Sequence, residues 1–418
     1  MRGLYCTRFN RNSSILGGMK RTGTTYKPLC IGLVLTFTIN GCIEEFDTEF
    51  ADFESTIVVE ATITNEMKRQ QVFLSRTYKF EEEGPRAETN AQIRIIEGGN
   101  TYTLLETEPG IYVSDQAFAA QPSTTYQLLI TTQNGRTYSS NEMALTNTAQ
   151  IDTLRAERIT NDFGEDGVAI LVDSFDATGN SKNFRYEFSE TYKVIAPEWN
   201  AFDLKSTGID CGVDVIPKVE QNQVCFSRNV SNDIILASTA NFDENRISNF
   251  MVRFVNGNNY IISHRYSVEV TQYILSNEAF SYFEALDQFT STESLFSESQ
   301  PGFLIGNVFA DENPDEKVLG FFDVSTVSKK RIFLNYDDFY QGEDLPPYVN
   351  PCLEIAPKLI SQGGARCILS ALVEANQVSY LNINDDPPFE EGPYLVVPRE
   401  CGDCTVLGSN VQPDFWIE

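Results

Sequence analysis

The chain has 418 residues and a formal net charge of −28, from 31 basic and 59 acidic residues. A surface this negative repels nucleic acid and anionic lipid headgroups, so neither is expected as a ligand. Apolar residues make up 41% of the chain, with 29 Phe and 18 Tyr, which is enough to build packed cores in two or three domains.

The first feature along the chain is a stretch that predicts export. Lys20 and Arg21 precede a run of about ten mostly apolar residues, the layout of a secretory signal and too short for a bilayer span. Residues 39–42, Ile-Asn-Gly-Cys, resemble the lipobox of bacterial lipoproteins, in which the cysteine is acylated and becomes the N-terminus. We therefore expect residues 1–41 to be a signal peptide and Cys42 a lipid anchor. The alternative is an ordinary signal peptide followed by a chance cysteine.

Residues 42–54 are rich in Asp and Glu and predict an acidic tether. The segment is similar to the export signal that sends lipoproteins of Bacteroidota to the outer face of the outer membrane. It can also be read as a solvated, disordered spacer. The expected location is the outer membrane, with the protein lipid-anchored and exposed at the cell surface.

Residues 55–147 predict a β-sandwich of immunoglobulin-like or transthyretin-like type. Short runs rich in β-branched and aromatic residues alternate with turn residues at the spacing that such sandwiches show. The first run covers residues 56–64. Gly98-Gly99-Asn100 separates two further runs, at 93–97 and 101–105, and predicts a hairpin.

Residues 148–275 predict a second β-sandwich, of fibronectin-III-like kind. Strand-like runs occur at 167–173, 183–188, 250–255 and 267–270. A long insertion at 195–232 contains Trp199, Cys211 and Cys225. Long insertions in compact domains are usually functional or cross-linked, and we expect this one to be cross-linked.

Residues 276–418 predict one helix, further strands and a cysteine-rich, loop-rich C-terminal region. Ser276 can cap a helix over 276–289, where apolar residues recur at three- and four-residue steps. Its apolar stripe predicts core packing and consists of Phe280, Phe283 and Leu286. Strands are expected at 303–309 and 318–324, and the tail from Gln341 onward is expected to be loop-like. The predicted fold class is therefore mainly β.

Six cysteines remain after the signal and the anchor, and they predict disulfides because an exported chain meets an oxidising compartment. They are Cys211, Cys225, Cys352, Cys367, Cys401 and Cys404. We expect a Cys211–Cys225 bridge, since both lie in one loop region, and leave the other pairs open. A zinc site made by the last four thiolates is the alternative, and a redox-active Cys401-x-x-Cys404 is a weaker one.

No catalytic constellation stands out, so an enzyme is not expected. His264 is the one histidine, no nucleophile elbow or phosphate loop accompanies it, and a structural place on a strand is the expectation. No cofactor or metal is expected. Acidic turns at 161–167 and 384–386 could offer calcium oxygens but lack the EF-hand spacing. The aromatic run at 335–340 could be a ligand surface or could fold inward.

Three stretches together resemble a lipoprotein family of Bacteroidota, catalogued as domain of unknown function 4249. The first covers residues 57–65, and the second covers residues 305–308 with 313–322 and 330–333. The third is the closing Cys401-Gly402-Asp403-Cys404 with Gln412-Pro413-Asp414-Phe415-Trp416. The resemblance implies a surface lipoprotein that accompanies a TonB-dependent outer-membrane transporter. It carries over no catalytic residues.

The leading hypothesis is thus a non-enzymatic, lipid-anchored accessory to a TonB-dependent transporter. The second is a free-standing surface module, such as an adhesin that binds glycan or peptide. The third is a hydrolase of extracellular polymers, which would need two carboxylates about 5–9.5 Å apart in a cleft.

Overall fold

The computed structural model describes residues 55–79, 82, 84–291, 304–364 and 366–418. Within these residues the protein is mainly β, with several sheets, one main helix and three disulfides, so the predicted fold class is confirmed. The expected signal peptide, Cys42 and the acidic tether lie outside the described residues. No described helix has both the length and the apolar character needed to cross a membrane.

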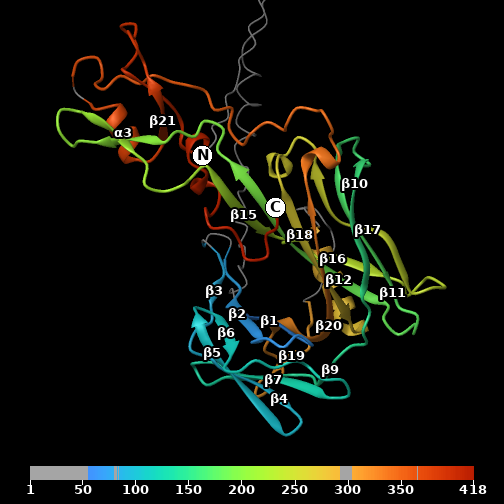
Figure 1. The fold of residues 1–418 in the computed structure, drawn as a ribbon. Coiled ribbons are helices and arrows are strands. Elements are labelled where there is room, and N and C mark those ends of the chain that lie inside the picture. The colour runs from blue at the N-terminus through green and yellow to red at the C-terminus, as the bar shows by residue number, and fades with distance from the viewer. Residues whose placement is uncertain (1–54, 80–81, 83, 292–303, 365) are drawn as a thin grey trace, which may run out of the picture. The chain divides into compact units, whose positions relative to one another are not determined.

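The N-terminal strands form one end of a large sheet, in the order β1-β2-β6-β5-β4-β7-β8, with β3 and β9 at its margins (Figure 1). Their bounds are β1 (Ile57–Thr64), β2 (Gln71–Arg76), β3 (Arg86–Ala87), β4 (Gln92–Glu97), β5 (Asn100–Glu108), β6 (Ile111–Ser114), β7 (Thr125–Thr131), β8 (Thr137–Ser140) and β9 (Met143–Ala144). The predicted hairpin is confirmed as β4–β5. Gly98 makes its turn with φ +54°, a conformation that favours glycine.

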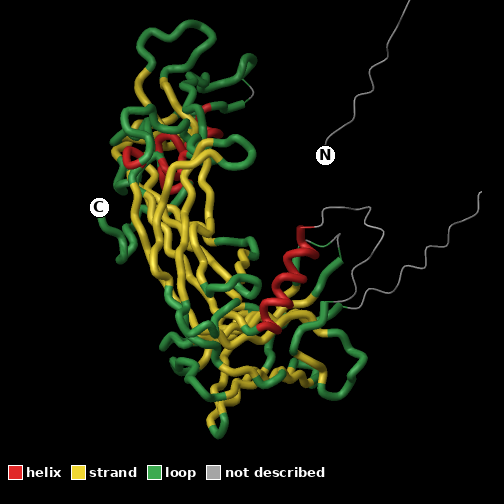
Figure 2. Tube along the Cα trace, turned by 90° about the vertical axis from the view of Figure 1, so that its right-hand side faces the viewer, coloured by secondary structure: helices red, strands yellow, loops and turns green. Residues whose placement is uncertain are grey.

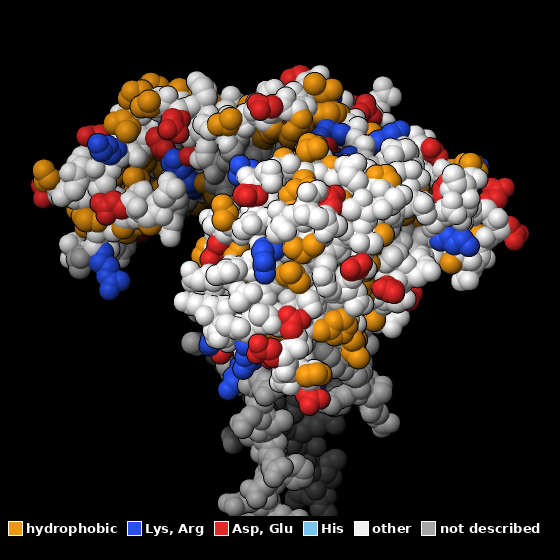
Figure 3. Space-filling view, turned by 90° about the horizontal axis from the view of Figure 1, so that it is seen from below, with side chains coloured by type: hydrophobic (Ala, Val, Ile, Leu, Met, Phe, Trp, Pro, Cys, Tyr) orange, Lys and Arg blue, Asp and Glu red, His pale blue; other side chains and the backbone are white. Residues whose placement is uncertain are grey.

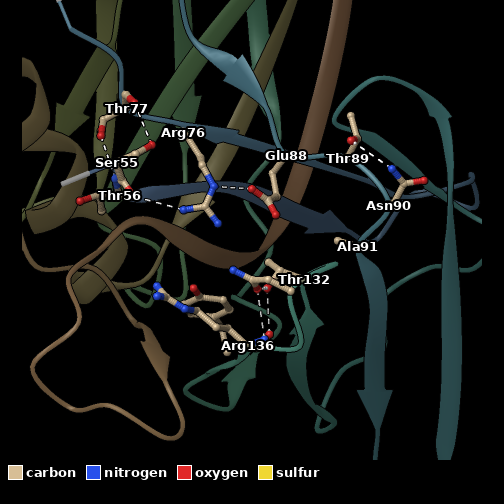
Figure 4. A network of polar contacts seen from close by, with 12 residues as sticks. Ser55, Thr56, Arg76, Thr77, Glu88, Thr89, Asn90, Ala91, Thr132 and Arg136 are labelled. Carbon is tan, nitrogen blue, oxygen red and sulfur yellow. Dashed lines mark hydrogen bonds and ion pairs between the residues drawn. The ribbon is translucent and has the colours of Figure 1, made fainter. Parts of the chain in front are cut away.

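Alternation along β1 explains the first core. Val59, Ala61 and Ile63 are buried, and the residues between them face the other side of the sheet. The buried side chains pack with those of β2, β4 and β7 into a cluster that includes Leu74, Ile95 and Leu128. The start of β1 is fixed as well, because the Thr56 N–H donates to Thr77 Oγ1 at 2.9 Å and Arg76 donates to the Ser55 carbonyl at 3.1 Å (Figure 4).

A second core lies between a three-stranded sheet and the other end of the large sheet. The small sheet has the order β10-β11-β17, and the large sheet continues as β15-β12-β18, with β16 beside β12. Its buried side chains come from both layers, for example Ile170 from β11 and Tyr266 from β18. The bounds are β10 (Ile151–Thr160), β11 (Asp166–Phe175), β12 (Asn183–Ile195), β15 (Val224–Val230), β16 (Ile235–Ser238), β17 (Arg246–Asn256), η1 (Tyr260–Ile262) and β18 (Tyr266–Leu275).

One long strand, β20 (Val318–Leu334), joins the two halves of the large sheet. Its first half pairs in parallel with β1 up to Ser325, and its second half pairs antiparallel with β18 from Thr326 onward. At the change of partner, Thr326 donates its hydroxyl to the Thr146 carbonyl at 2.7 Å, and the Val327 N–H donates to Asn65 Oδ1 at 2.9 Å. The sequence predicted domain boundaries at residues 147/148 and 275/276. Strands from all three of these expected domains belong to the one large sheet.

Helix α2 (Asn277–Ser291) begins where the sequence predicted it. Ser276 accepts a hydrogen bond from the Ala279 N–H at 3.0 Å, which satisfies one of the free donors of the first turn. Its predicted apolar stripe packs against the first core, as partly buried side chains. Strand β19 (Val308–Ala310) follows and pairs with β8.

The C-terminal region is less loop-like than expected, because it builds a small core with the insertion. The core residues are Leu204, Val213, Leu369, Val378, Tyr380 and Val396. They come from two hairpins and a short helix, and the first hairpin ends at Pro217 whereas the helix begins only at Leu369. The bounds are β13 (Phe202–Ser206), β14 (Val213–Pro217), η2 (Tyr336–Asp338), α3 (Leu369–Glu374), β21 (Val378–Ile383), β22 (Tyr394–Pro398), α4 (Arg399–Gly402) and η3 (Cys404–Val406).

All six cysteines form disulfides, but the expected Cys211–Cys225 bridge is wrong. The pairs are Cys211–Cys367, Cys225–Cys404 and Cys352–Cys401. The first two attach the insertion to the C-terminal region, so the insertion is cross-linked as expected, to a distant partner rather than within itself. Because all six are in disulfides and Cys401 and Cys404 have different partners, neither a thiolate zinc site nor a redox-active Cys401–Cys404 pair is formed.

On the face that Figure 3 shows, acidic side chains alternate with basic and apolar ones and do not gather in one patch. The charge at any particular site must therefore be read from its own residues.

Candidate functional site

A cleft of about 770 Å³ lies in the described part of the protein. Its floor is the face of β2, β1 and β20 that carries Phe73, Glu60 and Phe321. One wall is helix α2, drawn red in Figure 2, and the other is formed by β12, β18 and the loop 231–234. Clefts of this size are typical of sites that bind small organic ligands.

Cross-strand register places three floor residues in one row. Glu60 of β1 is paired with Phe73 of β2 on one side and with Phe321 of β20 on the other. Directly opposed residues share one face of a sheet, and all three line the cleft. The Phe73 ring is 42% exposed, so it offers an open apolar surface at the floor.

The helical wall contributes aromatic and aliphatic side chains. Tyr282 lies 5.2 Å from the Phe321 ring and 5.6 Å from the Phe283 ring, measured between centroids. Burial raises the pKa of Tyr282 to about 12, so its hydroxyl stays protonated at neutral pH. Leu286, one turn further along the helix, also lines the cleft.

The opposite wall carries Arg185 in a fixed position. Its guanidinium lies 4.4 Å from the Tyr273 ring centroid and 4.7 Å from the Phe283 centroid, which are favourable cation–π distances. Its Nη1 donates to Glu187 at 2.7 Å, and Glu187 also accepts the Tyr273 hydroxyl at 2.9 Å. The Nε of Arg185 has no hydrogen-bond partner among the residues that the structure describes. This Nε is itself shielded from solvent, but the side chain is 14% exposed and lines the cleft, so another N–H of the guanidinium can donate to a ligand.

Asp323 is a buried carboxyl on the same sheet. It is paired with the cleft residue Thr62 and is only 1% exposed. Ser325 donates to its Oδ2, whereas its Oδ1 has no partner among the described residues. Burial raises the pKa of Asp323 above its ordinary 3.8, and the Ser325 hydroxyl and the Arg185 charge oppose this only in part.

The variant Asp323→Asn is expected to be more stable than the native protein at pH 8, by roughly 1–3 kcal/mol. Asparagine removes the charge that burial disfavours and keeps an oxygen for Ser325. Since folding raises this pKa, the contribution of Asp323 to stability is fully present below pH 3.8 and is lost as the pH rises through the folded-state value. Urea unfolding from pH 4 to pH 8 should therefore show a gain that grows with pH.

The exposed Asp162 supplies the control, since Asp162→Asn should change stability little at any pH. A gain for Asp323→Asn that does not vary with pH would contradict the explanation.

A comparison with protein families places the chain among known sequences. Residues 43–331, more than half of the chain, match the family described as "Domain of unknown function (DUF4249)". The chain belongs to the DUF4249 family. The match contains the first resembling stretch and almost all of the second, and the closing Cys401–Trp416 stretch follows it. No curated protein matches this DUF4249 chain.

The other candidate sites of the DUF4249 protein have local structural roles. His264 lies between η1 and β18, not on a strand as expected, and burial lowers its pKa, aided by the charge of Lys193. The Asn161 side chain accepts the N–H groups of Phe163 and Glu165 at 3.0 and 2.9 Å, so the acidic turn uses its oxygens internally. Within the described ranges, no group of three or more His, Cys, Asp or Glu is arranged to hold a metal.

The aromatic run at 335–340 folds inward. Tyr336 and Tyr340 are buried and stack with ring centroids 4.7 Å apart, within the second core. Sequence reasoning did not find Arg185 or Asp323, which were read only as parts of strands. The one local signal was a carboxylate in the otherwise apolar run at 321–324, because a buried charge needs a reason.

Proposed function

We propose that this DUF4249 protein is a lipid-anchored surface lipoprotein of the outer membrane that binds a ligand in the cleft. It acts, without catalysing a reaction, as an accessory to a TonB-dependent transporter. The observation that carries the ligand-binding part is the cleft itself, with apolar walls and a few fixed polar groups, which is typical of binding sites. The lipobox-like segment before Cys42 and the acidic tether support the anchored location, and the family resemblance supports the transporter.

A binding role also agrees with the state of two acidic groups, Glu187 in the cleft and Asp323 below it. Glu187 accepts hydrogen bonds from Arg185 and Tyr273, and Asp323 is shielded from solvent. An acid–base pair that works on a bound polymer has to reach the reacting bond. These two carboxyl groups instead hold other side chains of the protein.

Affinity purification from detergent-solubilised outer membranes tests the proposal. Trp416 is buried and Glu418 pairs with Lys193 at 3.1 Å, so the tag should follow Glu418 through a flexible linker. We expect a TonB-type barrel to be recovered with the native protein in a ratio near one to one. The matched control is Cys42→Ala, which should leave the membrane fraction.

Recovery of the lipoprotein alone, in gentle detergent and at native expression level, would contradict the transporter role. That result would favour a free-standing surface module for glycan or peptide.

A further inference from the structure

The charges that line the cleft are balanced, unlike those of the whole protein. Three cationic residues line it, Lys68, Arg69 and Arg185, and three anionic ones, Glu60, Glu187 and Asp233. The chain as a whole has nearly twice as many acidic as basic residues. A ligand with a net charge would be repelled by as many charged side chains of the cleft as attract it. The cleft therefore favours an uncharged ligand.

The cleft also has an apolar lining of aliphatic side chains and aromatic rings in similar number. The aliphatic ones include Val58, Ile234, Leu286, Leu304 and Leu319, and the rings are those of Phe73, Tyr186, Tyr273, Tyr282, Phe283 and Phe321. A sugar carries a hydroxyl on almost every carbon, and each hydroxyl that faces an aliphatic wall loses its hydrogen bond to water. The lining therefore favours a ligand whose own surface is mostly aliphatic or aromatic.

Arg185 adds a directional requirement. Glu187 pairs with its Nη1 at 2.7 Å, and the exposed part of the side chain lines the cleft as a further donor. A neutral acceptor such as an amide carbonyl can take such a hydrogen bond without bringing a third carboxylate next to Glu187 and Asp323. A free carboxylate would add a negative charge to two that are already there.

We propose that the cleft binds an uncharged peptide segment with apolar side chains, whose carbonyl groups accept hydrogen bonds from Arg185. Peptide bonds combine a neutral acceptor and a neutral donor with apolar side chains at regular spacing, which is what the floor and walls present. The inference rests on the ligand-binding part of the proposed function and is independent of the anchor and of the transporter.

The test uses the mature chain with Cys42→Ala and intact disulfides. The probe is an equimolar pool of N-acetylated, C-amidated tetrapeptides made from alanine, leucine, phenylalanine and serine. Peptides that remain with the protein through size exclusion are identified by mass spectrometry, and the affinity of the most enriched one is measured by calorimetry. Two further pools are run beside it, the same peptides with a free C-terminal carboxylate and a set of neutral oligosaccharides.

We expect retention of end-blocked peptides rich in leucine and phenylalanine, with binding about tenfold or more weaker for the same peptides carrying a carboxylate. The affinity should change less than about twofold between low salt and 0.5 M salt, because no net charge is attracted. Binding should also have a negative heat-capacity change, the mark of apolar burial.

Variants locate the site. Arg185→Gln should weaken binding about tenfold, the effect of losing one hydrogen bond from a charged donor. Arg246→Gln is the matched control and should bind normally, since Arg246 also stacks on a ring, Phe175 at 4.2 Å, and also pairs with a carboxylate, Glu244 at 3.2 Å, but lies outside the cleft. Phe73→Ala is a second test that spares the core, because its ring is already 42% exposed. It should weaken binding several-fold.

The proposal is overturned if only the oligosaccharides or only the carboxylate peptides are retained. It is equally overturned if the neutral pool binds no better than millimolar, or if Phe73→Ala and Arg185→Gln both bind as the native protein does. None of these outcomes bears on the transporter, which the membrane purification tests separately. Peptide binding without a co-purified barrel would retain the inference and reject the accessory role.

Discussion

Replacing Gly320 with alanine is expected to destabilise the protein by more than about 4 kcal/mol, enough to prevent a stable fold. Gly320 has φ +117°, a conformation that residues with a side chain rarely adopt. A Cβ at this position would lie 1.9 Å from the carbonyl oxygen of Val59, which belongs to the paired strand and cannot move away. The effect should be large because Gly320 lies in the half of β20 that pairs with β1, and β20 joins both halves of the sheet.

The measurement is denaturant unfolding of the mature Cys42→Ala chain. Gly98→Ala is the matched control, because Gly98 also has a positive φ, +54°, but a Cβ there would meet nothing within 4 Å. It isolates the conformational part of the effect, about 1–2 kcal/mol. Equal unfolding midpoints for Gly320→Ala and Gly98→Ala would show that the close approach to Val59 does not matter.

Removing the Cys225–Cys404 disulfide is expected to have the second large effect. The bond closes a loop with a sequence separation of 179 residues, and the chain-entropy account then gives about 5 kcal/mol. Both sulfur atoms are fully buried beneath the C-terminal residues. The double variant Cys225→Ser with Cys404→Ser should therefore release the end of the chain before the sheets unfold.

Trp416 reports that release. Its ring lies 4.9 Å from Phe226 and 5.7 Å from Phe333, so its fluorescence should shift to the red when the end detaches. Removing Cys352–Cys401, with a separation of 49 residues, is the comparison and should cost about 4 kcal/mol. A larger loss for the shorter loop would contradict the entropic explanation.

Features that depend on neighbouring residues could be predicted from the sequence. The Gly98–Gly99 turn and the Ser276 cap act within four residues, and both occur as expected. Long-range pairings could not be predicted in this way. Cys211 has Cys225 close in sequence, yet its partner is Cys367, because the insertion folds against the C-terminal hairpin.

The cleft was beyond sequence reasoning for the same physical reason. Arg185, Phe283 and Asp323 come from β12, α2 and β20, and only the double pairing of β20 brings these elements together. No local sequence motif contains these three residues together. A buried carboxylate in a strand indicates that a polar partner lies nearby. It does not indicate which residue that partner is.

The pairing of β1 also decides how the protein responds to a mechanical load. A pull on the chain before Ser55 acts along β1, whose residues pair with β20 at eight positions and with β2 at five. Hydrogen bonds that are loaded along the strand direction share the force and break together, whereas bonds at a strand end that is pulled sideways break one after another. Where the chain enters the fold, the hydrogen bonds on both sides of β1 are thus placed in shear, which lets them resist a pull together.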